Sequence, residues 1–329
     1  MVTLRRGTVT EILERHDGLV RLEVDGRPCV AYPALTGPVA LGDDVVVNVQ
    51  ALDLELGSGG FDVLYANLTR GLGLPADDGA HVMKLPYTPL QHAAVHAEEG
   101  AGEGVPEMLT GLAVVCCSLH SQVAPACAGL GSDLAVGYVQ LPGGALPVAL
   151  SDAVRELRAR SYLNTTIAVG PCFGGDSACV SAASALLACA AAGLDAVVCA
   201  IGPGVVGTGS RYGHGGLAAA DAAIAARALG ASAVVAARVS GADERERHQG
   251  LSHHTRAALE LIGEPAVVAW PGGLEPPAGV EGLEVIDVSG WQEACAGLPL
   301  SHMGRGAGDD PWFFAAAYAA GALARARLG

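Results

Sequence analysis

Two patterns of hydrophobic positions divide the chain. Over residues 1 to 68, short runs rich in Val, Leu and Ile alternate with polar residues and are separated by turn sequences such as His16-Asp17-Gly18. Alternation with a period of two is typical of half-buried strands, and several such strands in so short a segment predict a small β-barrel. From about residue 111, continuous apolar runs alternate with helical, often alanine-rich runs. This second pattern predicts an α/β domain over 111–329, with a mostly parallel sheet between two layers of helices.

The runs of the second part also predict its order of elements. Strands are expected within residues 111–119, 134–141, 165–170, 195–202, 232–240, 266–270 and 283–290. Helices are expected near 121 and within residues 149–161, 177–193, 217–230, 253–263 and 309–329. Residues 69–110 form a connector between the two parts, in which 81–91 is apolar enough for a strand or a packed arm.

Composition limits the classes of partner. Hydrophobic residues make up 51% of the chain and charged residues 16%, which is enough to bury a large core and argues against long disordered stretches. The formal net charge of −15 argues against nucleic acid or an anionic membrane surface as a partner. Residues 1 to 70 contain six Arg and ten Asp plus Glu, so the barrel is expected to have a structural or docking role.

Lysine and cysteine usage narrow the chemistry and the compartment. Lys84 is the one lysine, so the chain has no P-loop and a single candidate for Schiff-base chemistry. The nine cysteines are an odd number without a C-x-x-C pair, and most lie inside apolar runs. Reduced, buried thiols are expected, and with them a cytoplasmic location. The longest uncharged helical run, 178–194, is interpreted as a buried helix, and a homodimer or other homo-oligomer is possible.

The loops that follow the predicted strands carry the unusual residues. In a parallel sheet these loops emerge at one edge, the carboxyl edge, where open α/β sheets bind ligands. The segments expected to meet there are His120 with Ser121, residues 142–144, residues 171–177, residues 202–216 and residues 241–254.

Residues 202–216, GPGVVGTGSRYGHGG, begin with a match to the dinucleotide fingerprint G-x-G-x-x-G. That fingerprint requires a helix near its third glycine and an acid about 20 residues further on, after the next strand. Here nine more loop residues follow Gly207, and the first acid after the next strand is Asp243. A compact anion is a better ligand, and a flexible glycine-rich connection is the alternative. The candidate anion ligands are Gly204, Gly207, Thr208, Gly209, Ser210 and Arg211.

Residues 170–177 follow the same logic. Gly174 and Gly175 precede a predicted helix that Asp176 or Ser177 could cap, and both glycines are candidate ligand-binding residues. Residues 170–174 also fit a nucleophile elbow with cysteine in place of serine, and the order Cys172, Asp287, His302 suits a hydrolase triad. The simpler interpretations are a buried apolar Cys172 and an Asp176 that caps its own helix.

Three histidines form the most informative polar cluster. Ser252 is expected to cap a helix whose first turn contains His253 and His254, and the helix dipole there disfavours their protonation. Neutral imidazoles can accept protons, donate hydrogen bonds or bind metals, and His254 is also a candidate ligand-binding residue. His248, His253 and His254 lack a standard zinc spacing, so no cofactor is predicted, although a divalent metal on these three remains the alternative.

Five motifs together resemble a bacterial family catalogued only as a domain of unknown function. They are HVMKLPYTPLQ, FGGD, GPGVVGTGSRYG, RHQGLSHHT and the C-terminal pair SHMGR and DDPWFF, and they span nearly the whole chain. The resemblance implies no established activity. At Cys172 the sequence departs from the small, non-nucleophilic residue of that family's pattern, which argues against a cysteine nucleophile.

The sequence therefore predicts an enzyme or small-ligand binder that acts on a compact anion, such as a phosphoester or a carboxylate. In the enzyme, His253 or His120 is the acid or base, Asp176 orients it, and the 204–211 loop stabilises negative charge. Two alternatives stay open. One is a metal-dependent hydrolase that uses the histidines of 248–254, and the other is an assembly or regulatory protein whose barrel docks a partner.

Overall fold

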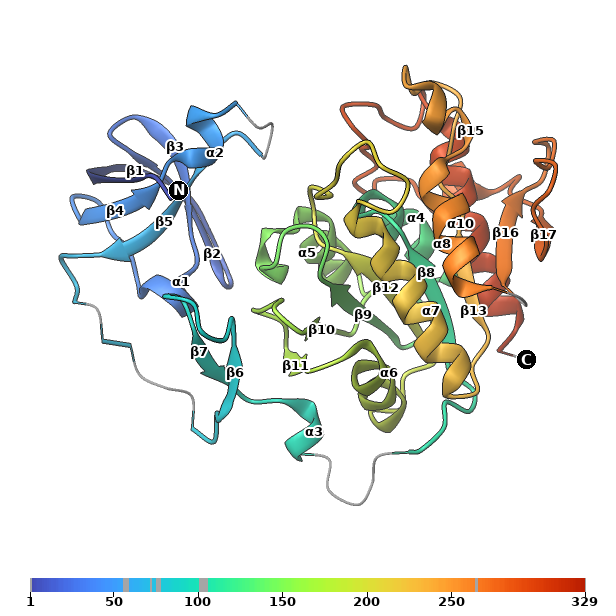
Figure 1. Ribbon diagram of the computed structural model, residues 1–329, viewed down its shortest axis with the longest axis horizontal. Coiled ribbons are helices and arrows are strands. Elements are labelled where there is room, and N and C mark those ends of the chain that lie inside the picture. The colour runs from blue at the N-terminus through green and yellow to red at the C-terminus, as the bar shows by residue number, and fades with distance from the viewer. Residues whose placement is uncertain are drawn as a thin grey trace. The chain divides into compact units, whose positions relative to one another are not determined.

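The structure is a computed structural model that describes residues 2–55, 59–71, 73–74, 78–100, 106–263 and 266–328. The chain divides into two compact units, residues 1–95 and 96–329, and each is described by itself (Figure 1). The predicted connector contributes to both units, because its first strands belong to unit 1 and its short helix belongs to unit 2. Connector residues 72, 75–77 and 101–105 lie outside the described residues.

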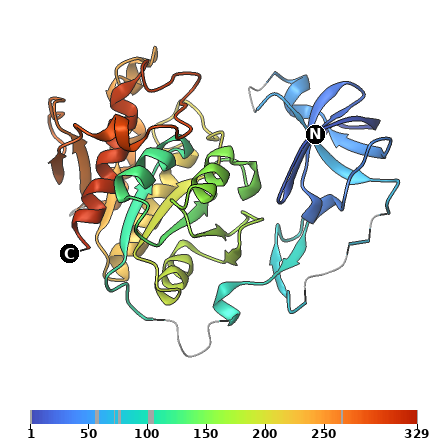
Figure 2. The same cartoon turned by 180° about the vertical axis from the view of Figure 1, so that it is seen from behind.

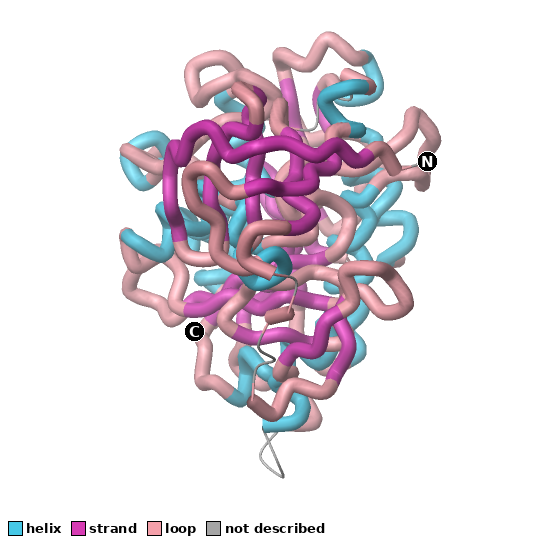
Figure 3. The backbone as a smooth tube through the Cα atoms, turned by 90° about the vertical axis from the view of Figure 1, so that its left-hand side faces the viewer, coloured by secondary structure: helices cyan, strands magenta, loops and turns pink. Residues whose placement is uncertain are grey.

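Unit 1 contains the predicted barrel, whose strands are coloured magenta in Figure 3. Five strands close it in the order β1-β2-β3-β5-β4: β1 (Leu4–His16), β2 (Leu19–Val24), β3 (Arg27–Ala31), β4 (Asp44–Asn48) and β5 (Asp62–Asn67). The inward-facing residues are mostly valine and leucine, with one cysteine. Helices α1 (Pro33–Thr36) and α2 (Gln50–Asp53) connect strands, and β6 (Val82–Lys84) pairs with β7 (His92–Ala94).

Unit 2 is built on an eight-stranded sheet in which every pairing between neighbours is parallel. Its order is β11-β10-β9-β12-β8-β13-β16-β17. The strands are β8 (Ala113–Cys117), β9 (Val136–Leu141), β10 (Thr165–Val169), β11 (Ser177–Cys179), β12 (Ala196–Ile201), β13 (Ala233–Ala236), β16 (Val267–Pro271) and β17 (Leu283–Ile286). A separate pair, β14 (Val239–Ser240) and β15 (Gly250–Leu251), lies within the segment between β13 and the next helix.

Helices cover both faces of the sheet, as predicted. One face packs against α4 (Val123–Leu130), α5 (Asp152–Ala159), α9 (Trp291–Ala294) and α10 (Pro311–Ala326). The other packs against α6 (Ala182–Ala191), α7 (Ala218–Ala228) and α8 (His253–Ile262). Figures 1 and 2 show α10 alongside α4. Their backbones approach so closely that a Cβ on Gly129 would lie 2.2 Å from the carbonyl oxygen of Tyr318, a contact that only small residues allow.

The order of the strands creates a topological switch point, which we call the crevice beside β8. The chain leaves β8 for α4 on one face, whereas the adjacent β12 and β13 lead to α7 and α8 on the other face. Connections that depart to opposite faces leave an opening outside the carboxyl ends of the strands, and ligands of open α/β sheets bind at such switch points. The loops after β8, β12 and β13 are therefore the first place to look for a site.

Two further sequence predictions can be judged from the backbone. The helix predicted from residue 177 begins at Ala182, because Ser181 caps it and residues 177–179 instead form the edge strand β11. Asp176 and Ser177 are therefore not the cap, and that prediction was wrong.

Within the described ranges, none of the helices combines the length and hydropathy that a membrane crossing requires. The remaining elements are α3 (Ala97–Gly100) and the 3₁₀ turns η2 (His120–Gln122), η3 (Val148–Leu150), η4 (Gly215–Leu217) and η5 (Glu246–His248).

Candidate functional site

Four histidines meet in the crevice beside β8. His214 comes from the loop between β12 and α7, while His248, His253 and His254 come from the segment between β13 and α8 and from the first turn of α8. The ring of His214 stacks on that of His254 with centroids 3.7 Å apart, and the centroids of His253 and His254 are 4.5 Å apart. The ring centroids of His248 and His253 are 4.8 Å apart. Three of these residues were predicted from the sequence, whereas His214 was not, since its neighbours in sequence are glycines and not histidines.

Ser252 fixes two members of the histidine cluster. Its hydroxyl accepts a hydrogen bond from the backbone nitrogen of His254 (3.2 Å), which confirms the predicted cap of α8. The same hydroxyl lies 2.7 Å from Nδ1 of His248. One serine thus caps the helix at the backbone of His254 and holds the ring of His248.

Arg238, which follows β13, is 2% exposed and contacts both the histidine cluster and an aspartate. Its Nη1 donates to Nδ1 of His254 (3.1 Å), and its Nη2 lies 3.4 Å from a carboxylate oxygen of Asp243. Because a guanidinium can only donate, Nδ1 of His254 must be the unprotonated nitrogen, and Nε2 carries the proton of the neutral ring. Burial lowers the pKa of Arg238 to about 10, so it stays charged at neutral pH.

Around Arg238 lies an arginine network with an excess of positive charge. Arg245 binds Asp243 through two nitrogens, each at 2.9 Å, and Arg305 lies 3.5 Å from Asp243 and 3.4 Å from Asp310. The two aspartates, 3% and 1% exposed, face three arginines, which leaves one positive charge uncompensated within the network. A bound anion would neutralise it.

Several ring nitrogens of the site are buried without a partner. Both nitrogens of His214 and Nε2 of His253 lack a hydrogen bond of acceptable geometry and are shielded from solvent. A buried polar group that makes no hydrogen bond is costly, and native structures seldom contain such groups unless a ligand, water or ion satisfies them. The histidine cluster is therefore suited to bind something through these nitrogens.

All four imidazoles are held neutral. Burial, aided by the nearby positive charge of Arg238, lowers the pKa of His248 to about 3. Burial and the adjacent His214 lower that of His254 to about 2. Burial likewise lowers the pKa of His214 and of His253. The lowered pKa values of His253 and His254 agree in direction with the neutrality expected for these two residues, although burial is the largest cause and not the helix dipole.

The loop after β8 brings His120 to this edge, and the segment before α10 brings His302. Nε2 of His120 lies 2.7 Å from the hydroxyl of Ser151, and its Nδ1 lies 3.2 Å from the carbonyl oxygen of Ile201. Both nitrogens of His120 are thus engaged with the protein, and burial lowers its pKa to about 4. His302, which precedes α10, stacks on Phe313 with centroids 3.9 Å apart. In this conformation His120 links the loops of three strands rather than facing the crevice with a free nitrogen.

The glycine-rich loop, residues 202–216, folds as a tight antiparallel excursion. The backbone nitrogen of Thr208 donates to the carbonyl oxygen of Gly213 (2.7 Å), and that of Gly215 donates to Val206 (2.7 Å). Of the glycines at 202, 204, 207 and 209, Gly204 alone has a positive φ, of 71°. Two N–H groups of the loop are therefore used within the protein, and three of the four glycines do not adopt the left-handed conformation that the expected concavity of N–H groups assumed. The expectation that the helix starts well after Gly207 is confirmed, since α7 begins at Ala218.

The polar side chains of this loop are also engaged. Arg211 forms an ion pair with Glu260 of α8, and Tyr212 donates to the same carboxylate at 2.8 Å. The hydroxyls of Thr208 and Ser210 lie 2.9 Å from each other. The charge that the sequence analysis assigned to an anion through Arg211 is thus compensated by the protein itself.

Close backbone packing explains the glycines at positions 202 and 215 of the loop. A Cβ on Gly215 would lie 1.9 Å from the carbonyl oxygen of Gly143, in the loop after β9. A Cβ on Gly202 would lie 2.1 Å from the carbonyl oxygen of Ala145, in the same loop. The glycines let two loops meet backbone to backbone, and this contact holds His214, the residue before Gly215, against His254.

The residues predicted around 172–176 lie elsewhere. Asp176 accepts hydrogen bonds from the side chain of Arg158 (2.7 Å) and from the backbone nitrogen of Thr166 (2.8 Å), near the start of β10. It is therefore committed to the sheet edge and does not orient His253 through any of these contacts. Gly175 packs against the same strand, since a Cβ added to it would lie 2.9 Å from the carbonyl oxygen of Thr166. Gly174 adopts a φ of 75°.

The predicted triad is not assembled by its side-chain contacts. Cys172 is fully buried. Asp287 accepts from the hydroxyl of Ser289 (3.1 Å), and Nδ1 of His302 lies 3.0 Å from the hydroxyl of Ser121. Neither the acid nor the base pairs as a Cys-dependent hydrolase would require.

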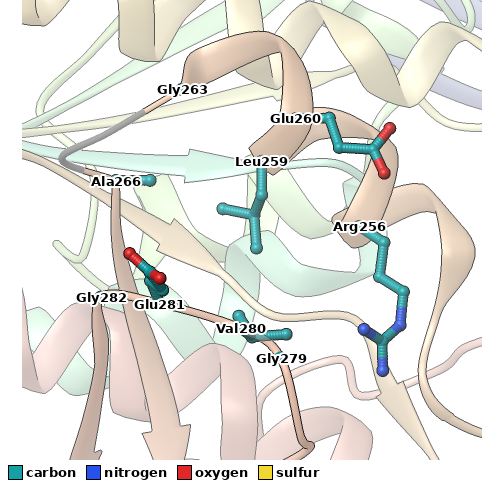
Figure 4. Close-up of a pocket in the computed structure, with 9 residues that line it drawn as sticks. All are labelled: Arg256, Leu259, Glu260, Gly263, Ala266, Gly279, Val280, Glu281 and Gly282. Atoms are coloured by element: carbon teal, nitrogen blue, oxygen red, sulfur yellow. The ribbon is translucent and has the colours of Figure 1, made fainter.

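A surface pocket of about 600 Å³ lies between the second half of α8 and residues 279–282 (Figure 4). Its lining combines Leu259, Val280 and several glycines with the side chains of Arg256, Glu260 and Glu281. This pocket contains none of the histidines and none of the arginine network, so it is not the site described above.

Comparison with known proteins places the chain in a family without an assigned activity. No curated protein matches the sequence. The model of the family DUF3866, described as a protein of unknown function, matches residues 28–321. The match begins within β3, so it leaves out β1 and β2 of the barrel but includes nearly all of the α/β unit. The chain is therefore a member of the DUF3866 family.

Proposed function

We propose that the protein is an enzyme that binds a small anion, a phosphoester or a carboxylate, in the crevice beside β8. The observation that carries the proposal is the arginine network of Arg238, Arg245 and Arg305, which retains one positive charge after its pairing with Asp243 and Asp310. Arg305 is 20% exposed in its side chain and Arg245 38%, so both can reach a ligand that approaches from solvent.

The histidine cluster supplies the acid–base chemistry in this proposal. His253 is only half-buried, and its Nε2 has no partner. Since its pKa is lowered by burial and by neighbouring arginines, the ring is neutral at physiological pH and can accept a proton from a bound substrate. The arginines would then stabilise the negative charge that develops when the proton leaves.

Reduced cysteines support a cytoplasmic setting for this activity. All nine cysteines are buried and none forms a disulfide. Buried free thiols persist in reducing compartments, so the proposal places the enzyme in the cytoplasm, where small phosphorylated and carboxylated metabolites are abundant.

Thermal unfolding of the full chain tests the anion site. Phosphate, sulfate or malonate should raise the melting temperature of the α/β unit above that in chloride at matched ionic strength. At a concentration 100-fold above Kd the expected stabilisation is about 2.7 kcal/mol, which corresponds to roughly 5–10 °C for a unit of this size. An enzyme screen with phosphomonoesters and carboxylic esters should then use the anion that gives the largest shift.

Two variants decide which arginines are responsible. Arg305→Gln removes one charge of the network from a partly exposed position and should abolish most of the shift. Arg211→Ala is the matched control, because Arg211 is exposed and paired with Glu260, and it should keep the full shift. Loss of the shift in Arg211→Ala with retention in Arg305→Gln would transfer the anion site to the glycine-rich loop and refute the proposal.

A further inference from the structure

We propose that His214, His253 and His254 together bind one divalent transition-metal ion. The inference rests on the anion site of the proposed function, because the metal would lie beside the arginine network that holds the anion. With metal bound, Nε2 of His253 would be a ligand and would no longer accept a proton from the substrate. It adds a cofactor and a ligand, His214, that neither the family description nor the sequence pattern assigns.

The positions of the ring nitrogens are close to those that a metal requires. One nitrogen of each of the three rings can be chosen so that all lie within 4.8 Å of one another. Nitrogens bound tetrahedrally to zinc at about 2.0–2.1 Å are separated by roughly 3.3 Å. The nitrogens would have to approach by up to about 1.5 Å. One ring of the stacked pair His214 and His254 would also have to rotate, because the in-plane lone pairs of parallel rings do not converge on one ion.

Unsatisfied nitrogens point independently to a ligand. His214 is 7% exposed, and neither of its ring nitrogens has a hydrogen-bond partner of acceptable geometry. Nε2 of His253 is in the same condition. A metal ion would bind one nitrogen of each ring at the same time. A single water molecule could satisfy the same ring nitrogens only if their protonated and unprotonated states matched its own donors and acceptors.

The third ligand has to give up a contact. Nδ1 of His254 accepts a hydrogen bond from Arg238, so its other nitrogen carries a proton in the conformation described. Coordination by Nδ1 would replace this hydrogen bond directly. Coordination by Nε2 would require the proton to move to Nδ1, which could then no longer accept from Arg238. In either case the affinity for metal should depend on Arg238, whose guanidinium would be released toward the anion when His254 turns to the ion.

The ligand set selects the type of metal. Imidazole nitrogens favour Zn²⁺, Co²⁺, Ni²⁺ and Cu²⁺, whereas Mg²⁺ and Ca²⁺ require oxygen ligands. Three protein nitrogens leave an open position, as in catalytic zinc sites, and an anion or a water can occupy it. The ion would add to the positive charge of the arginine network, so metal and anion should each strengthen the binding of the other by the same factor.

Metal titration of the full chain provides the test. Protein stripped with a chelator should bind one equivalent of Zn²⁺ or Co²⁺ by calorimetry and elemental analysis, and it should not respond to Mg²⁺ or Ca²⁺. The Co²⁺ form should show the visible absorption of a nitrogen-ligated, four- or five-coordinate ion. His214→Ala and His253→Ala should each weaken binding by more than the 10- to 100-fold that loss of an outer-shell partner costs.

Matched controls separate the site from surface histidines. His16→Ala in the barrel and His302→Gln in the α/β unit remove histidines that lie outside the proposed ligand set, and both should bind metal as the unchanged protein does. If His214→Ala does not fold, the half-buried His253→Ala carries the test. The proposal is overturned if stoichiometric metal is absent, or if the controls lose metal to the same extent as the ligand variants.

The outcome also separates this inference from the proposed function. If the protein stripped of metal binds no added metal, but phosphate still stabilises it and Arg305→Gln abolishes that effect, the metal site alone is refuted. If the protein binds one equivalent of metal through His214, but anions stabilise neither the unchanged protein nor Arg305→Gln, the anion site alone is refuted.

Discussion

Replacing Gly215 by alanine should displace the loop that carries His214. The added Cβ would lie 1.9 Å from the carbonyl oxygen of Gly143 and 2.5 Å from its Cα. Van der Waals contact begins at roughly 3.5 Å, so the two backbones would have to separate by about 1–1.5 Å. Overpacking usually costs about 1–3 kcal/mol, and here no flexible side chain can yield, so we expect about 3 kcal/mol of lost stability.

Tryptophan fluorescence during urea unfolding measures this change without interference from the barrel. The three tryptophans, Trp270, Trp291 and Trp312, all belong to the α/β unit. The midpoint of their transition should fall in Gly215→Ala while its slope is unchanged. Because His214 precedes the substituted residue, the variant should also lose Co²⁺ binding.

Gly209→Ala is the matched control in the same loop. A Cβ at this position meets nothing within 4 Å, and the backbone is not in the left-handed region. The variant should unfold within about 0.5 kcal/mol of the unchanged protein and keep its metal. If Gly215→Ala unfolds at the same urea concentration as Gly209→Ala, the close contact between the loops after β9 and β12 is not what positions His214.

Two further predictions concern the other groups of this edge. Burial lowers the pKa of His302 to about 3, so the unfolded chain takes up its proton first as the pH falls from about 6.5. Stability should be fully present above that pH and should decline below it by up to about 1.4 kcal/mol per unit. His302→Gln should make the fluorescence-detected midpoints less dependent on pH between 6.5 and 4, and an unchanged slope would contradict this. Asp176→Ala breaks the contacts with Arg158 and Thr166 and should cost about 1–2 kcal/mol. It should leave the thermal shift by phosphate intact, and a loss of that shift would restore Asp176 to the site.

The fold was predictable because it depends on periodicity. A period of two over residues 1 to 68 predicted the barrel, and alternating apolar and alanine-rich runs predicted the parallel sheet with helices on both faces. The departure at 177–181 has a local cause. Residues 177–181 are too few, and too polar at their start, for their sequence pattern to indicate one structure. The pattern fits both an edge strand followed by a cap at Ser181 and the first turn of a longer helix.

The site was predictable only where its residues are close in sequence. Ser252, His253 and His254 follow one another, and the capping signal correctly placed both histidines in the first turn of α8. His214 joins them from another loop, and that contact depends on the approach of Gly215 to Gly143, which no sequence period encodes. Arg211 was favoured as the anion ligand because it is a charge among glycines, but its pairing with Glu260 links positions 49 residues apart.

The overall charge of the chain makes the local excess of positive charge more informative. With a net charge of −15, the protein repels small anions at long range, although screening limits this to about 10 Å at 0.1 M salt. Attraction by the whole molecule therefore cannot bring an anion to the crevice beside β8. An anion would have to be selected by short-range contacts, and buried charges such as Arg238 are screened far less than exposed ones. In the proposed site, a buried guanidinium held between a neutral imidazole and a shared carboxylate would be suited to that task, because its positive charge is confined to the place where the anion would bind.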